Sequence, residues 1–343
     1  MTPEALAAAI SDALADVPEV PSDGVEVKVE RPKNRDHGDY ATNVALTLAK
    51  RAGIPPRDLA AKIVEVLQAN PGIEALEIAG PGFINITLAA DAAGQIARAV
   101  VEQGSTYGTI DALVGTAVNL EFISANPTGP LHLGHTRWAA VGDAMARVLA
   151  AAGAQVTREF YVNDRGVQMD KFGLSLEASA LGVPVPEGGY QGEYIHDLAQ
   201  RIVADDPAIV HLPEPERMVA FREAGYALQL QQQKDVLDNF RTHFDVWYSE
   251  RSLHETGAVD RGMAKLRAQG HVYESDGAVW LRTTDFDDDK DRVLIKADGE
   301  LTYFASDTAY YVDKRDRGFD VCIYLLGADH HGYVNRLRAV AAC

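Results

Sequence analysis

A strand, a helix and a second strand follow one another in residues 117–162, and this order constrains the fold more than any other feature. The sequence predicts strands over Val118–Ile123 and Val156–Val162, and between them a helix over Thr136–Ala152 that Gly153 ends. The helix is expected to bury its large apolar residues Trp138, Val141, Met145, Val148 and Leu149. Strand, helix and strand of this length form a parallel unit. The chain is therefore predicted to contain an α/β domain built on a doubly wound parallel sheet.

The rest of this domain is expected to extend to the end of the chain, over residues 117–343. The continuous apolar run Val321–Leu326 predicts another strand, buried on both faces of the sheet. A helical and hairpin insertion is expected at about residues 185–300, with its hairpin at Ala278–Lys296. The final helix, Tyr333–Ala342, has no stop signal, so we expect an incomplete sheet and a C-terminally truncated chain.

The first hundred residues follow a different pattern and predict a separate α+β domain over residues 1–104, with a linker over 105–116. The expected elements are a helix after Thr2-Pro3, a strand over Val25–Val29, a helix from Pro56, strands at 75–79 and 83–88, and a helix at 91–102. A chain of 343 residues is longer than one core usually organises, which supports two domains.

Composition excludes several classes of protein. Lys and Arg total 32 against 50 Asp and Glu, so the net charge of −18 argues against a general nucleic-acid coat protein. It leaves open a specific nucleic-acid enzyme with a locally basic surface. Two cysteines, Cys322 and Cys343, exclude a disulfide framework and suit a reducing cytoplasm. No apolar run approaches the ~18 residues of a membrane span, so no membrane partner is expected.

The loop Ala125–His135 carries the strongest chemical signal. It joins the first predicted strand to the helix, at the sheet edge where doubly wound folds bind ligands. His132 and His135, beside the free amides of a helix N-terminus, would surround a phosphate, and Gly134 would allow close approach. A bare His-x-x-His is also compatible with a structural turn or half of a zinc site. Its position between strand and helix favours the phosphate site.

Other motifs are absent or incomplete. There is no phosphate-binding loop of the Gly-x-x-x-x-Gly-Lys-Ser/Thr type and no Gly-x-Gly-x-x-Gly opening a helix. The acidic run Asp285–Asp291 lacks the bidentate glutamate of a calcium loop, because Lys296 stands at that position. His330-His331 has no third ligand at useful spacing, so no tightly bound metal is predicted.

Four stretches resemble one family. His132-Leu-Gly-His135 resembles the "HIGH" signature of class I aminoacyl-tRNA synthetases, and the wider string 121–135 is similar to that of bacterial arginyl-tRNA synthetases. Residues 37–43 resemble the N-terminal domain of that family, 303–307 its arginine pocket and 327–333 the second half of its sheet. The resemblance spans essentially the whole chain. It implies a Rossmann-like catalytic domain with an N-terminal α+β domain.

The resemblance also implies a reaction, in which ATP, with Mg²⁺, activates L-arginine to arginyl-adenylate before transfer to tRNA(Arg). The implied catalytic and phosphate-binding residues are His132 and His135, with Gly134 at the adenine and Asp329 and His330 near the adenosine. The implied arginine-binding residues are Glu250, Tyr303 and Asp307 around the guanidinium, and Glu121, Ser124 and Asn126 beside the polar head. A guanidinium is planar and always charged, so its pocket needs carboxylates. We expect the histidines and acidic residues to share one crevice.

The N-terminal domain of this family docks the outer corner of the tRNA. The resemblance places Phe83 there as a stacking aromatic and Asn85 as a base-reading amide. Phe83 is equally compatible with a core strand position. The family's lysine loop and anticodon-binding domain are not found here, so we expect weak binding of arginine and ATP and poor charging of tRNA. The expected protein is a cytoplasmic monomer that binds no DNA.

Two other functions are compatible with parts of the sequence. A small nucleotidyltransferase could use the same histidine loop on a coenzyme precursor. It would need neither an N-terminal domain nor the set of Glu250, Tyr303 and Asp307. The chain could also serve only as a tRNA-docking module. A structural protein fits least, because it would have no use for the histidine loop.

Overall fold

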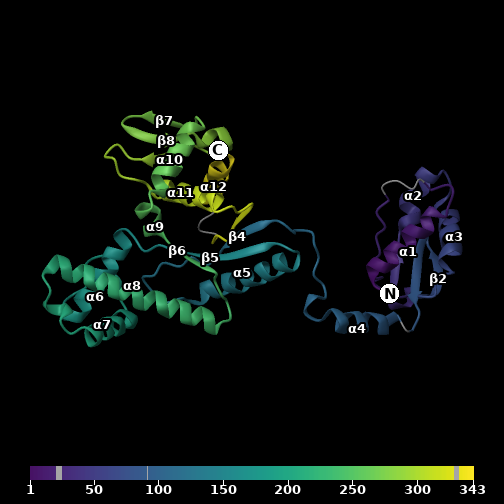
Figure 1. Ribbon diagram of the computed structural model, residues 1–343, viewed down its shortest axis with the longest axis horizontal. Helices are drawn as coiled ribbons and strands as arrows, with labels where there is room; N and C mark the ends of the chain where they lie inside the picture. Colours follow the sequence, from purple (N-terminus) through teal and green to yellow (C-terminus); the bar gives the residue numbers. More distant parts are fainter. Residues whose placement is uncertain (21–24, 91, 328–331) are drawn as a thin grey trace. The chain divides into compact units, whose positions relative to one another are not determined.

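The computed structural model describes residues 1–20, 25–90, 92–327 and 332–343 (Figure 1). The chain forms two compact units, Met1–Gly108 and Thr109–Cys343. Each unit has its own hydrophobic core.

The first unit packs helices against a three-stranded antiparallel sheet of order β1-β3-β2. Its elements are α1 (Pro3–Ala15), β1 (Tyr40–Thr42), α2 (Val44–Ala52), α3 (Pro56–Leu67), β2 (Ile73–Ala79), β3 (Phe83–Leu88) and α4 (Ala92–Gln103), with 3-10 turns η1 (Arg35–His37) and η2 (Gly104–Thr106). Thr2 caps α1, because its hydroxyl accepts a hydrogen bond from the Ala5 amide at 3.2 Å. The core joins Leu6 and Ile10 of α1 to Ile63 of α3 and Ile84 of β3.

The prediction of a strand over Val25–Val29 is wrong. The segment forms no ladder, and only Glu30, just beyond it, makes a bridge, with Ala41. The alternation that suggested a strand is nevertheless real, because all three valines of the segment pack against the core of the unit. Alternating burial therefore reflects an extended chain lying on a core and does not by itself require a ladder.

The second unit contains the predicted parallel sheet, in the order β10-β4-β5-β6 (Figure 1). Its strands are β4 (Ala117–Glu121), β5 (Gln155–Val162), β6 (Val246–Ser249) and β10 (Val321–Tyr324). The prediction of a Rossmann-like α/β fold is confirmed. β6 lies inside the range 185–300 expected for the insertion and is itself a strand of the parallel sheet.

β10 departs from the prediction of a strand buried on both faces. It lies at the edge of the sheet in the described part of the chain, and Val321 is 41% exposed while the other three residues are half-buried. A strand with a neighbour on one side only is covered less completely than a central strand.

Two further layers complete this unit. The helices α6 (Val167–Leu181), α7 (Glu193–Asp205) and α8 (Glu214–Asn239) pack together around Phe172, Leu176 and Phe221, with the turn η3 (Ile209–His211) between them (Figure 1). The second layer contains α9 (Glu250–Glu255), α10 (Ala258–Ala268), β7 (Val272–Ser275), β8 (Ala278–Leu281), η4 (Thr283–Phe286), β9 (Arg292–Ile295), α11 (Tyr303–Asp316) and α12 (Tyr333–Ala342). The predicted hairpin corresponds to β8 and β9.

The helix after β4, α5 (Leu133–Ala151), buries a different face from the one predicted. Its buried residues are Ala139, Gly142 and Ala146. Val141 and Val148 are exposed, and Trp138, Met145 and Leu149 are half-buried. The reason is the Phe122 ring, since a Cβ placed on Gly142 would lie 2.2 Å from its Cδ2 atom. Small residues therefore bring α5 close to the end of β4.

This close approach predicts that Gly142→Ala destabilises the protein by about 2 kcal/mol, because the added methyl group overpacks a filled site. The measurement is urea unfolding followed by circular dichroism. Gly94→Ala is the matched control, since Gly94 also lies in a helix but a Cβ there meets nothing within 4 Å. The control is expected to be neutral or slightly stabilising. An unchanged unfolding midpoint for Gly142→Ala would contradict the packing described.

Candidate active site

The backbone after β4 is strained where the predicted ligand loop begins. Ile123 and Ser124 have φ values of 67° and 44°, a region that a β-branched residue rarely occupies. Hydrogen bonds hold this conformation. The Ser124 hydroxyl donates to Glu121 Oε1 at 3.1 Å and accepts from the Tyr161 amide at 3.1 Å. Strain maintained in this way at the carboxyl end of a strand is typical of a functional site.

The loop that follows is fixed by the helical layer. Gln233 of α8, which is buried, donates through Nε2 to the carbonyl oxygens of Asn126 at 3.0 Å and Gly129 at 2.9 Å. The Asn126 side chain donates to Gln168 at 2.9 Å. Gln233 could not be identified from the sequence, because a glutamine on a long helix carries no signal for a contact over 100 residues away.

His132 and His135 form the N-terminal cap of α5. Nδ1 of His132 accepts from the Gly134 amide at 3.1 Å, and Nδ1 of His135 accepts from the His132 amide at 3.1 Å. Each neutral ring therefore carries its proton on Nε2, the nitrogen left to donate to a ligand. Burial, followed by the nearby His132, lowers the pKa of His135. Gly134 is also needed locally, since a Cβ there would lie 2.9 Å from the His132 ring.

An acidic cavity of about 390 Å³ lies beside this loop, lined by five of the six predicted arginine-binding residues, Glu121, Ser124, Asn126, Tyr303 and Asp307. β4 and its loop supply the first three, and α11 supplies Tyr303 and Asp307 one turn apart. Burial, then the charges of Glu121 and Glu250, raises the pKa of Asp307 to about 7. A carboxylate in such a position gains strongly from a cationic ligand.

Glu250, the sixth residue, lines a neighbouring cavity of about 1110 Å³ at the start of α9. Tyr303, 67% exposed, lines both cavities. Burial, then the charge of Asp164, raises the pKa of Glu250 to about 7, while a hydrogen bond from Tyr161 opposes the rise. The charge of Glu250 also raises the pKa of Asp307, so the two carboxylates lie close enough to interact electrostatically.

The histidines do not line these cavities. His132 and His135 face a third cavity of about 480 Å³, between the start of α5 and the end of α8. The single crevice expected from the sequence is therefore replaced by separate cavities. The predicted adenosine-binding residues Asp329 and His330 lie outside the described residues.

Several residues of the acidic site were missed from the sequence. The additional residues lining its smaller cavity include Tyr161, Asn163, Gln168, Tyr310, Tyr324 and Tyr333. Asp164 is buried behind Glu250, where its carboxylate accepts from the hydroxyls of Tyr226 at 3.0 Å and Ser249 at 2.6 Å. Tyr161 and Asp164 stand at or just after the carboxyl end of β5, and that position was the available signal.

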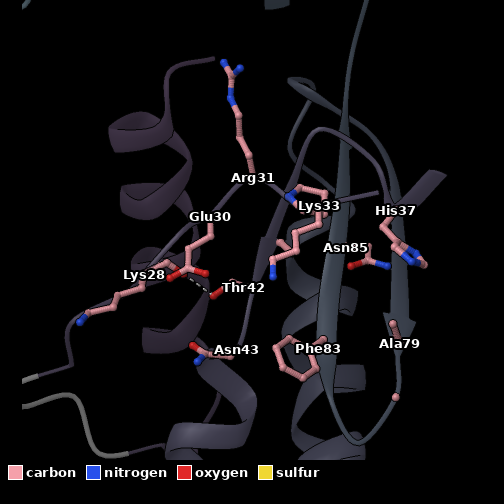
Figure 2. Close-up of a pocket in the computed structure, with 13 residues that line it drawn as sticks. Lys28, Glu30, Arg31, Lys33, His37, Thr42, Asn43, Ala79, Phe83 and Asn85 are labelled. Atoms are coloured by element: carbon pink, nitrogen blue, oxygen red, sulfur yellow. Dashed lines mark hydrogen bonds between the residues drawn. The ribbon is translucent and has the colours of Figure 1, made fainter. Parts of the chain in front are cut away.

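A second cavity of interest, of about 390 Å³, lies in the first unit (Figure 2). Phe83 and Asn85 both face it from β3, as residues two apart on a strand do. Phe83 is 41% exposed, so the alternative that it is a core strand residue is wrong. Asn85 is buried, and its Nδ2 has no hydrogen-bond partner among the described residues.

The cavity in the first unit is locally basic although the chain as a whole is acidic. Lys28, Arg31, Lys33 and His37 line it together with one acidic residue, Glu30 (Figure 2). A basic rim around an exposed aromatic ring and an unpaired amide suits an unpaired base and its phosphates.

Two kinds of site were not found in the part of the chain that the structure covers. Within the described ranges, no group of three or more His, Cys, Asp or Glu side chains is placed to hold a metal ion. No helix within those ranges combines the length and apolar character needed to cross a bilayer.

Comparisons with known proteins agree with the architecture of both units. Residues 4–88 match the family model "Arginyl tRNA synthetase N terminal domain", and residues 96–200 match "tRNA synthetases class I (R), catalytic domain". The arginine–tRNA ligases of Renibacterium salmoninarum and Paenarthrobacter aurescens are 57% and 55% identical over the whole of this chain. The chain belongs to the arginyl-tRNA synthetase family. It spans about 64% of the length of each of these two relatives.

Solved structures of this family have the same fold. A Campylobacter jejuni structure described as an arginyl t-RNA synthetase matches with a TM-score of 0.67 and 33% identity, covering 72% of this chain and 56% of its own. The Thermus thermophilus arginyl-tRNA synthetase matches with a TM-score of 0.58 and 24% identity, covering 91% and 53%. At 24% identity, the likeness to the Thermus thermophilus structure shows a shared fold alone.

Proposed function

We propose that the protein is an arginine–tRNA ligase, which activates L-arginine with ATP and transfers the arginyl group to tRNA(Arg). The observation that carries this proposal is the pair of carboxylates Asp307 and Glu250, which line neighbouring cavities and each have a pKa of about 7. Two carboxylates held in this way gain most from a ligand with a permanent, delocalised positive charge. Membership of the arginyl-tRNA synthetase family supports the choice of arginine.

The proposed roles follow from the chemistry of each group. Asp307 and Glu250 bind the guanidinium, and Tyr303 lines both of the cavities that these two carboxylates line. Glu121, Ser124 and Asn126 face the polar head. The arginine carboxylate attacks the α-phosphorus of ATP and pyrophosphate leaves. No general base is required, because the nucleophile is already ionised, so positioning and charge neutralisation supply the acceleration.

His132 and His135 are proposed to donate from Nε2 to the ATP phosphates, with Gly134 at the adenine. Nδ1 of each ring accepts a hydrogen bond from a backbone amide, which leaves Nε2 of each ring to donate. Asp329 and His330 are retained as proposed adenosine contacts on the resemblance alone. Mg²⁺ would arrive bound to ATP, and we assign no side chain to it. Cys322 and Cys343 are both free thiols, which supports a cytoplasmic location.

A nucleotidyltransferase acting on a coenzyme precursor fits less well. That reaction would use the histidine loop but would leave the carboxylates of Glu250 and Asp307 without a cationic ligand.

The raised pKa values predict that arginine binds more tightly as pH rises. For a carboxyl group with a pKa of about 7, the ionised fraction grows from about one tenth at pH 6 to about nine tenths at pH 8. Because the guanidinium binds the ionised form, the Kd for arginine is expected to fall at least about fivefold between these pH values. Calorimetry with this chain at millimolar arginine is the measurement.

Asp307→Asn tests the assignment of this pH dependence. The variant is expected to bind arginine at least about 30-fold more weakly and to lose part of the pH dependence. Glu255→Gln is the matched control, because Glu255 is an exposed carboxylate that lines the larger cavity. It should change neither the affinity for arginine nor its pH dependence. Arginine binding that is independent of pH, or equally strong in Asp307→Asn, would contradict the proposed pocket.

We further propose that the first unit docks tRNA through its basic cavity. The exposed ring of Phe83 stacks on an unpaired base, and the free Nδ2 of Asn85 donates to that base. Lys28, Arg31 and Lys33 face the neighbouring phosphates.

Phe83→Ala is expected to weaken tRNA binding about tenfold, since stacking of one base on an aromatic ring contributes about 1–3 kcal/mol. Asn85→Ala is expected to weaken it by a smaller factor. The measurement is fluorescence anisotropy with labelled tRNA at fixed salt. Val101→Ala, which removes a more exposed apolar side chain of the same unit, is the control. Unchanged affinity in both Phe83→Ala and Asn85→Ala would exclude this docking site.

A further inference from the structure

A lysine is buried completely beneath the acidic cavity. Lys314 of α11 has 0% of its surface exposed, which is exceptional for this residue type. Its ammonium group donates to Glu121 Oε2 at 2.5 Å and lies 3.9 Å from the ring centroid of Tyr324 and 4.3 Å from that of Tyr310. A buried ammonium between two aromatic faces and one carboxylate is fixed in position.

The charge of Lys314 is directed at Glu121 rather than at the other nearby carboxylate. Glu159 lies 4.0 Å from Nζ, and its charge is already matched by Arg317, which donates to both of its oxygens at 2.6 and 2.9 Å. The Tyr310 hydroxyl also donates to Glu159. Lys314 is therefore the counterion of Glu121.

Lys314 does not reach the cavity itself. It follows Tyr303, Asp307 and Tyr310 at spacings of four, three and four residues, so all four lie on one face of α11. Lys314 stands two turns beyond Asp307, about 10 Å along the helix axis, and it does not line the cavity. Three of its contacts, Glu121, Tyr310 and Tyr324, do line the cavity, and Glu121 is the charged one among them.

Glu121 is held at both carboxylate oxygens. Oε2 accepts from Lys314, and Oε1 accepts from Ser124 at 3.1 Å. Each oxygen has two lone pairs, so one on each remains free for a ligand. The result is a carboxylate of fixed orientation at the wall of the cavity.

Building on the proposed function, we propose that Lys314 is a positioning residue that fixes Glu121 to receive the α-ammonium group of arginine. Asp307 and Glu250 recognise the guanidinium end, and the pair of Lys314 and Glu121 recognises the amino end. The site would thereby distinguish an α-amino acid from a guanidino compound that lacks the amino group.

The test compares two ligands on the same chain: L-arginine and 5-guanidinopentanoic acid, which is arginine without its amino group. The wild-type chain is expected to prefer arginine by at least about tenfold, the range for a hydrogen bond between charged groups. In Lys314→Met the preference is expected to fall to within about threefold, while the affinity for 5-guanidinopentanoic acid changes little. A general packing defect would instead weaken both ligands alike.

Lys265→Met is the matched control, because Lys265 makes an exposed ion pair with Asp316 at 3.2 Å. It should leave the preference intact. If Lys314→Met does not fold, Lys314→Gln replaces it, and loss of the preference there supports the proposal. Retention of the full preference in a folded Lys314 variant overturns it. Failure of the wild-type chain to bind arginine would instead count against the proposed function itself.

Discussion

The arrangement around the acidic cavity of the second unit depends on holding three carboxylates close together. Glu121, Glu250 and Asp307 come from β4, α9 and α11, and the charges of the first two help to raise the pKa of Asp307 to about 7. Three neighbouring carboxylates repel one another, so their ionised forms are unfavourable without a counterion. The arrangement is tolerated because Lys314 offsets one charge from beneath the cavity, and because a cationic ligand would offset the others.

The fold brings these groups together by placing the carboxyl ends of its parallel strands side by side. Glu121 ends β4, Tyr161 stands near the end of β5, and Glu250 directly follows β6. The small residues of α5 allow this helix to approach the Phe122 ring, and the strained turn at Ile123 and Ser124 follows directly. Contacts behind the site, from Gln233 and Asp164, then fix the loop and the start of α9.

Much of this could be predicted from the sequence, because the relevant signals are local. The order of strand, loop and helix predicts that His132 lies at the start of a helix, as it does. The spacing of Tyr303 and Asp307 predicts that both lie on one face of a helix, which is α11. The buried face of α5 could not be predicted. Periodicity favours the large residues Trp138 and Val141, whereas the space available depends on Phe122, which belongs to another element.

Other features depend on distant contacts and carry no local signal. A lysine near a helix end is usually exposed, so the burial of Lys314 follows from its partners on other elements, Glu121 of β4 and Tyr324 of β10. The three valines of Val25–Val29 do pack against the core, but their alternation could not show that the segment has no ladder partner among the described residues. The exposure of Phe83 was likewise decided by tertiary structure alone.

If this acidic cavity holds arginine in one orientation, a crystal structure of the chain with L-arginine will show the guanidinium between Asp307 and Glu250, with the amino group within hydrogen-bonding distance of Glu121. Arginine bound in the reverse orientation, or found only outside this cavity, would contradict this assignment.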